Sequence, residues 1–135
     1  MSVVVDASVL VAAILDSGAG GVWAEQVLGR GPIYGPELVS VETTNIIRRL
    51  ERAKQITRFE ANSAHQDHLQ LNIELYPFAP FADRIWAMRH VLTSYDAWYV
   101  AVAEALKLPL ATLDRRLARA GGTSCEFLLP GDEPR

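Results

Sequence analysis

The feature that most constrains the fold is a valine-rich apolar run at residues 1–5 that stops at Asp6. A short, unbroken apolar run of this kind is typical of a strand buried on both faces of a parallel sheet. Helical periodicity follows directly, at residues 8–15. A buried strand that passes at once into a helix is typical of an α/β fold.

The rest of the chain continues this alternation of strands and helices. Short apolar segments bounded by turn residues predict further strands at residues 33–34, 73–76, 110–112 and 126–129. Helical spacing and capping residues predict further helices at residues 22–28, 37–54, 57–71, 81–92, 94–106 and 114–120. We therefore expect an α/β fold, a three-layer α/β/α sandwich with a mainly parallel central sheet, formed by residues 1–135 as a single domain.

The composition is that of an ordinary globular protein. Half of the residues are hydrophobic and 21% are charged, which excludes a disordered or fibrous chain. The apolar stretches fall far short of the ~20 residues that a membrane span needs. A signal peptide has a Lys or Arg before its apolar segment, and none precedes the first apolar stretch of this chain. The lone Cys125 cannot form an internal disulfide, so we expect a reducing compartment, the cytoplasm.

The charge is unevenly distributed along the chain. A net charge of −3 argues against a protein that holds nucleic acid through its overall field alone. Lys and Arg nevertheless cluster within residues 48–58 and again within residues 115–119. Locally basic surfaces are therefore expected, although a solvated helix face is the simpler interpretation of any single one of these arginines.

Two acids lie at the ends of predicted strands: Asp6 directly after the first, and Asp114 within two residues of the strand at 110–112. Ligand chemistry in open parallel sheets collects where strands end and helices begin, at the carboxyl edge of the sheet. Both residues are therefore candidates for a shared site there. The alternative for each is a structural role as an N-cap that accepts hydrogen bonds from free helix amides.

Two further acids, Glu42 and Asp96, lie in predicted helices where a simple surface role fits poorly. Glu42 falls one turn after Leu38 and one turn before Ile46, on the apolar stripe that should face the sheet. Asp96 lies in the first turn of a very apolar helix, where a helix-dipole role is the alternative. Its aromatic neighbours predict partial burial, and a buried carboxylate requires a positive partner.

Four carboxylates at one sheet edge would repel each other. Each close pair costs about 4 kcal/mol at ~4 Å and an effective dielectric near 20. Hard oxygen ligands without nearby Cys or His favour Mg²⁺, with Mn²⁺ as the alternative, to offset this repulsion. One or two such ions can polarise a phosphate and lower the pKa of an attacking water, so the pattern predicts hydrolysis at phosphorus.

Three segments of the chain resemble the successive acidic motifs of PIN domains, and in particular those of VapC toxins. They read VVVDASVLVAAIL, ELVSVETTNIIRRL and SYDAWYVAVAEALKLPLATLDRRLARA, and they are spread along the chain, so the resemblance covers nearly its whole length. The last segment is the most specific, because it combines an acid after Tyr, an Ala-rich apolar helix, a Leu-Pro-Leu strand and Thr-Leu-Asp. By this resemblance Asp6, Glu42 and Asp96 match the principal metal-site acids of the family, and Asp114 its fourth, more variable acid.

The resemblance also implies supporting residues and partners. Ser8 and Thr112 match small hydroxyl positions that accompany the acids and orient a ligand or water. The family implies Mg²⁺-dependent cleavage of RNA, assembly into homodimers, and silencing by a cognate VapB-like antitoxin whose C-terminal segment blocks the site. Arg115 and Arg116, just past Asp114, are candidates for contact with RNA phosphates, because guanidinium groups suit phosphate geometry.

Two other functions remain open from the residues. The first is a phosphatase that uses Asp6 as a covalent nucleophile, but that scheme wants a second acid two residues later, where Ser8 stands, and a suitably placed Lys. The second is a catalytically idle PIN-like module that binds a partner protein, which the intact set of acids disfavours.

Overall fold

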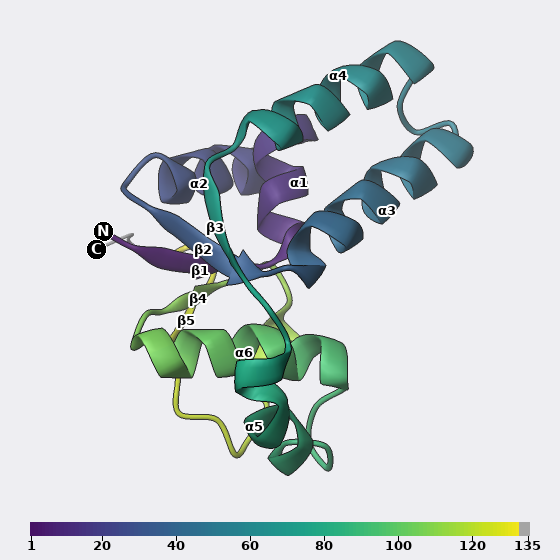
Figure 1. Cartoon of the computed structure of the whole chain (residues 1–135). Coiled ribbons are helices and arrows are strands. Elements are labelled where there is room, and N and C mark those ends of the chain that lie inside the picture. Colours follow the sequence, from purple (N-terminus) through teal and green to yellow (C-terminus); the bar gives the residue numbers. More distant parts are fainter. Residues whose placement is uncertain (133–135) are drawn as a thin grey trace.

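A five-stranded parallel sheet runs through the middle of the computed structural model, which describes residues 1–132 (Figure 1). The strand order is β3-β2-β1-β4-β5, and every neighbouring pair is parallel. The strands are β1 (Val3–Val5), β2 (Ile33–Pro36), β3 (Ile73–Tyr76), β4 (Leu110–Ala111) and β5 (Phe127–Leu128). The last three residues of the predicted domain 1–135 lie outside the described residues.

Helices cover both faces of the sheet, which confirms the predicted three-layer α/β/α sandwich (Figure 1). One face carries α1 (Ala7–Leu15), α2 (Ala19–Leu28), α3 (Leu38–Arg52) and α4 (Arg58–Gln70). The other face carries α5 (Ala82–Ala87) and α6 (Ser94–Leu106). The remaining helical segments are η1 (Ala79–Phe81), a 3₁₀ turn, and α7 (Arg115–Ala118), which links β4 to β5.

The central strand β1 explains why the chain opens with valines. Val3, Val4 and Val5 are fully buried, because helices cover both faces of the strand. The chain passes from β1 to β2 on one side and returns later to place β4 on the other side of β1. Crevices outside the carboxyl ends of strands at such a switch in strand order are the usual place for ligands in open α/β sheets.

Helices α3 and α4 form an arm that projects from the body of the molecule (Figure 1). The arm is defined here as residues 38–70. A small hydrophobic cluster of its own, separate from the main core, contains Ile47, Ala61 and Ala64. The Thr57 hydroxyl caps the start of α4, and the Glu60 carboxylate accepts a hydrogen bond from the Thr57 amide in return.

The helices α1 and α2 meet at a sharp bend that glycine makes possible. A Cβ atom on Gly21 would lie 1.7 Å from the Asp16 carbonyl oxygen, so the close approach of the two helices depends on its absence. Within residues 1–132 no single helix is long and apolar enough to span a membrane. α1 and α2 reach that length only together, with a bend of 110° between them.

The observed elements depart from the predicted ranges mainly at helix ends. The helix predicted at residues 81–92 is a 3₁₀ turn followed by a short helix that ends at Ala87, and residues 88–92 form successive turns. Thr93 then caps α6 through a hydrogen bond from the Asp96 amide. The helix predicted to reach residue 120 ends at Ala118, shortly before Gly122 adopts a φ of +77°.

Candidate active site

Asp6 lies at the carboxyl end of β1 and is 8% exposed. One carboxylate oxygen accepts hydrogen bonds from the Ser8 hydroxyl at 2.5 Å and from the Val9 amide at 3.2 Å, which caps α1. The other oxygen accepts a hydrogen bond from the Thr112 hydroxyl. Burial raises the pKa of the Asp6 carboxyl, and the hydrogen bonds from Ser8 and Thr112 partly oppose this rise.

The two hydroxyls tie the ends of β1 and β4 together around Asp6. The Asp114 amide donates to the Thr112 hydroxyl oxygen at 2.9 Å, and the Leu113 amide donates to the Ser8 hydroxyl oxygen at 3.1 Å. Each hydroxyl therefore accepts from the segment that follows β4 and donates to Asp6. This arrangement fixes the Asp6 carboxylate at the carboxyl end of β1.

Glu42 on α3 is joined to Tyr99 on α6, whose hydroxyl donates a hydrogen bond to the Glu42 carboxylate. Tyr99 is 2% exposed. Burial is the largest cause of its raised pKa, followed by the hydrogen bond to Glu42 and the negative charges of Glu42, Asp6 and Asp96. The charges of three of the predicted acids thus converge on one buried hydroxyl.

Sequence reasoning did not assign a role to Tyr99. A signal was available, because Tyr99 follows Asp96 by three residues and therefore shares its face of the helix. The pairing of Tyr99 with Glu42 could not be predicted from sequence spacing. Glu42 is 57 residues away in the chain, and only the packing of α3 and α6 around the sheet brings the two side chains together.

Asp96 and Asp114 form the outer part of the site. Asp96 is half-buried, and its pKa is raised first by burial and next by the charge of Asp114, while Thr93 and Arg116 lower it. Asp114 caps α7 by accepting from the Arg116 amide at 2.9 Å and the Leu117 amide at 3.3 Å. The helix-cap alternative and the shared-site prediction therefore both describe part of its surroundings.

The two arginines after Asp114 are placed differently. The Arg116 Nε lies 3.8 Å from an Asp114 carboxylate oxygen, and the rest of its side chain is exposed. The Arg115 guanidinium donates to the Pro130 carbonyl at 3.2 Å. Of the two predicted phosphate contacts, Arg116 is the one beside the acids.

The donor set of this site suits a hard divalent cation. Within residues 1–132 no three His, Cys, Asp or Glu side chains converge closely enough to enclose a metal ion. The carboxylates are turned instead toward hydroxyl donors: Asp6 toward Ser8 and Thr112, and Glu42 toward Tyr99. Burial raises the pKa of Asp6, which means that ionising this carboxyl costs free energy, and no described salt bridge offsets that cost. A cation bound to the carboxylate oxygens would stabilise the ionised form.

A cleft of about 490 Å³ opens beside the acids, between α1 and α3. Ser8 and Leu113 line it next to the site, and Ile46, Leu50 and Arg49 line its α3 side. Its walls are mainly apolar, and Ser8, whose hydroxyl donates to Asp6, connects the cleft with the acids.

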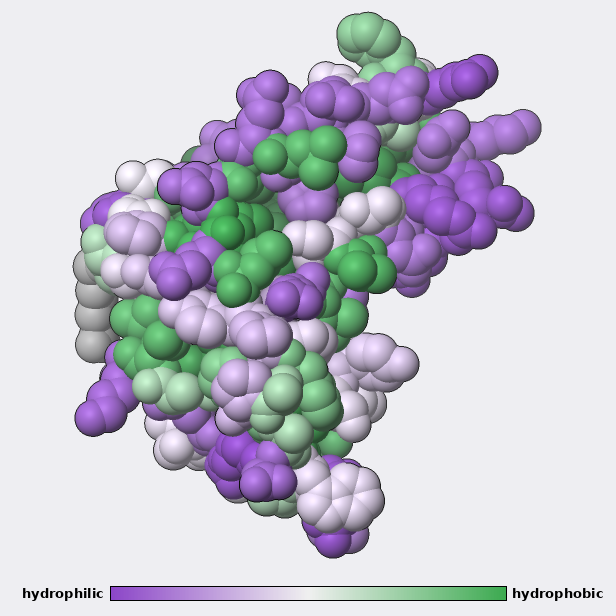
Figure 2. Space-filling model, in the orientation of Figure 1, coloured by the Kyte–Doolittle hydropathy of each residue, from purple (hydrophilic) through white to green (hydrophobic). Residues whose placement is uncertain are grey.

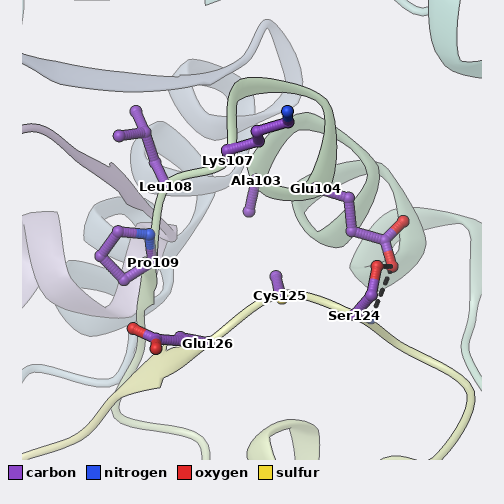
Figure 3. A pocket seen from close by; sticks show the side chains of 8 residues that line it. All are labelled: Ala103, Glu104, Lys107, Leu108, Pro109, Ser124, Cys125 and Glu126. Carbon is purple, nitrogen blue, oxygen red and sulfur yellow. Dashed lines mark hydrogen bonds between the residues drawn. The ribbon is translucent and has the colours of Figure 1, made fainter.

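The cavity of about 410 Å³ in Figure 3 lies elsewhere, between the carboxyl end of α6 and the segment before β5. Glu104 and Ser124 in its wall are hydrogen-bonded to each other. Cys125 points into it, and burial raises the pKa of this thiol to about 11. A thiol with so high a pKa is a poor nucleophile, so this cavity does not compete with the acids as a catalytic site.

The chain is similar to known proteins over nearly all of its length. The family model for the PIN domain matches residues 3–122. Ribonuclease VapC9 of Mycobacterium tuberculosis is 37% identical over 123 residues, covering 91% of this chain and 94% of that protein. Ribonuclease VapC1 of the same species is 36% identical over 127 residues, covering 93% and 96%.

Solved structures with the same fold have lower sequence identity. PAE2754 from Pyrobaculum aerophilum has a TM-score of 0.71 and 23% identity, covering 94% of this chain and 83% of that one. VapC20 of M. tuberculosis, a sarcin-ricin loop cleaving toxin, has a TM-score of 0.66 and 18% identity, covering 90% of this chain and 96% of that one. VapBC2 from Rickettsia felis, bound to a promoter DNA fragment, has a TM-score of 0.65 and 16% identity, covering 94% and 98%.

Proposed function

This chain belongs to the PIN-domain family and, within it, to the VapC ribonucleases, and we propose that it is a Mg²⁺-dependent endoribonuclease, the toxin of a VapBC-type toxin–antitoxin pair. The observation that carries the proposal is the convergence of the charges of Glu42, Asp6 and Asp96 on Tyr99, at the switch point of the sheet. Asp114 joins this group through its charge on Asp96.

The residues that would hold the metal are Asp6, Glu42, Asp96 and Asp114, directly or through water. Mg²⁺, or Mn²⁺ in its place, supplies Lewis-acid stabilisation of the scissile phosphate and of the water that attacks it. Which of the two ions serves is part of the proposal, because carboxylate oxygens suit both.

The chain's own residues hold the ligands in position. Ser8 and Thr112 orient the Asp6 carboxylate, each through one of its two oxygens. Tyr99 orients Glu42 in the same way. Arg116, which stands beside Asp114 and carries an exposed guanidinium, would bind a phosphate oxygen of the RNA.

The proposed partners follow from the family. We place a VapB-like antitoxin segment in the cleft beside Ser8 and Leu113, where it would cover the acids. The structural likeness to VapBC2 supports a partner of this kind. A homodimer and a cytoplasmic location, the latter based on the lone Cys125, complete the proposal.

The test uses purified protein freed from any bound antitoxin and incubated with total RNA. Mg²⁺ should support cleavage, EDTA should abolish it, and Asp6→Asn should abolish it while preserving the fold, because Asn has the same shape, accepts from one of the two hydroxyls and can donate its amide N–H to the oxygen of the other. Asp83→Asn, which alters an exposed acid in the first turn of α5, is the matched control and should cut like the unaltered protein. Cleavage that persists in EDTA or in Asp6→Asn would overturn the proposal, and a fully idle protein would favour the binding module.

A further inference from the structure

The tip of the arm carries a concentration of positive charge that the acids do not use. Residues 48–58 contain one acid, Glu51, and five cations: Arg48, Arg49, Arg52, Lys54 and Arg58. This segment, the arm tip, has a formal charge of +4 in a chain whose net charge is −3, so the remaining residues carry −7. Such a separation of charge attracts a polyanion to the arm tip, in addition to the basic segment at residues 115–119.

The five cations are exposed and unpaired within residues 1–132. The salt bridges of the described chain join Arg84 to Glu104 and Arg116 to Asp114, and neither involves the arm tip. Figure 2 shows mostly hydrophilic side chains at the end of the arm that points away from the body, with a hydrophobic one at its uppermost part. Because no internal acid neutralises these groups, they remain available to an external anion.

Packing and capping interactions fix the backbone next to the arm tip. Ile47 is 5% exposed and packs in the small cluster with Ala61 and Ala64, which joins α3 to α4. The capping box of Thr57 and Glu60 fixes the start of α4 directly after the basic segment. A packed helix pair fixes the backbone that carries these cations, so only their side chains are ordered when a ligand binds.

Several of the basic residues lie on the same helix as Glu42, farther along α3. At a rise of 1.5 Å per residue, Arg48 lies about 9 Å and Arg52 about 15 Å along the helix axis from Glu42. Arg48 shares an exposed hollow with Val41, the neighbour of Glu42 in sequence. Arg49 faces the other side, in the cleft that also contains Ser8. A chain whose phosphate lies at the acids therefore has cations beside it on both sides of α3.

We propose that the arm tip is a second RNA-binding site, which holds the phosphate backbone of the substrate away from the cleaved bond. The inference rests on the proposed ribonuclease function and extends it. It assigns the arm tip to the phosphate backbone, which lysine and arginine side chains bind whatever the base sequence. The nuclease would then bind RNAs long enough to reach the arm more tightly than short ones.

Two lysines offer a closely matched test. Lys54 and Lys107 each follow a helix in the left-handed conformation, with φ of 59° and 57°, where glycine is the usual residue. Lys54→Gly and Lys107→Gly therefore remove the same charge and relieve the same backbone conformation. Only Lys54 lies on the arm, while Lys107 lines the cavity of Figure 3.

Binding is measured by titrating fluorescent single-stranded polyuridine RNA with each protein in EDTA, over a series of salt concentrations. The plot of log affinity against log salt should become less steep by about 0.7 for Lys54→Gly, the amount expected for one lost phosphate contact on single-stranded RNA. Lys107→Gly should keep the slope of the unaltered protein. Equal slopes for the two variants would overturn the proposal.

A second pair enlarges the effect. Arg48→Gln/Arg52→Gln should weaken binding at least tenfold at low salt, whereas Arg89→Gln/Lys107→Gln, with the same change in net charge, should not. Equal weakening by the two double variants would show that net charge alone drives RNA binding. No weakening by either would show that the arm tip does not bind RNA and would favour a protein partner there. Each of these results would overturn the inference. Mg²⁺-dependent cleavage by the unaltered protein tests the ribonuclease function separately, so the two failures are distinguishable.

Discussion

The hydroxyl of Tyr99 on α6 donates a hydrogen bond to the carboxylate of Glu42 on α3. The two helices lie on opposite faces of the sheet, so this bond crosses its carboxyl edge (Figure 1). Tyr99 is buried and Glu42 is partly buried, and the pair stands next to the charges of Asp6 and Asp96. Tyr99 is therefore a positioning residue for one of the proposed metal ligands.

Replacing Tyr99 by Phe should raise the Mg²⁺ concentration needed for half-maximal cleavage by about tenfold to a hundredfold, the usual effect of losing a partner of a metal ligand. The free energy of unfolding should fall by about 1 kcal/mol, the net value of one hydrogen bond. Activity as a function of Mg²⁺ and thermal unfolding measure the two effects. An unchanged Mg²⁺ requirement with the same loss of stability would mean that Tyr99 only supports the fold.

Substitutions of Thr112 test whether the hydroxyl that donates to Asp6 is needed. Thr112→Val removes both the bond to Asp6 and the acceptor for the Asp114 amide, so we expect a loss of about 1 to 3 kcal/mol in the free energy of unfolding and a marked loss of cleavage. Thr112→Ser keeps the hydroxyl and should retain most of both. Denaturant unfolding and RNA cleavage distinguish the variants. Equal behaviour of Val and Ser would contradict a role for the hydroxyl.

Most of the fold was predictable from the sequence because its signals are local. The valine run of β1, the Thr57 cap of α4 and the apolar length of α6 each report on a few neighbouring residues, and all three elements are found. Helix ends were less predictable. The predicted helix at residues 81–92 ends at Ala87, and the turns that follow bring the chain to the Thr93 cap of α6, which is a tertiary requirement.

The site was predictable in part for the same reason. Asp6 and Asp114 follow strands, and strand ends in a parallel sheet meet at one edge, so their neighbourhood follows from topology. The pairing of Glu42 with Tyr99 was not predictable, because it depends on how helices from two layers pack. Metal ligation by the four acids remains a prediction, for which the Mg²⁺ experiments are the test.

The two left-handed lysines also make a prediction about stability. A non-glycine residue in the left-handed conformation destabilises the folded state by roughly 1 to 2 kcal/mol, and glycine removes this strain. Glycine also gives the unfolded chain more conformational entropy, which offsets part of the gain. Lys54→Gly and Lys107→Gly should each raise the free energy of unfolding by roughly 0.5 to 1 kcal/mol. Denaturant unfolding measures this. A decrease for Lys54→Gly would attribute any loss of RNA binding to damage of the arm.

Glu104 links three parts of the chain far from the acids. Its carboxylate accepts two hydrogen bonds from the Arg84 guanidinium, at 2.8 and 2.9 Å, and two from Ser124, at 2.7 and 3.0 Å. Arg84 donates in addition to the Gly122 carbonyl. Arg84 is the main cause of the lowered pKa of Glu104, and Ser124 adds to it against the opposing effect of burial.

A lowered pKa in the folded state means that the ionised carboxylate stabilises the fold. This contribution is complete above the ordinary Glu value of 4.5 and is lost as the pH falls through the lower folded value. Glu104→Gln should therefore lower the free energy of unfolding by about 1.5 kcal/mol at neutral pH, and the gap to the unaltered protein should close on acidification below that range. Denaturant unfolding at a series of pH values measures it. Glu126→Gln, which alters an exposed acid outside the described salt bridges, should leave the dependence of the free energy of unfolding on pH unchanged. If the difference between Glu104→Gln and the unaltered protein persists at low pH, packing rather than charge is responsible.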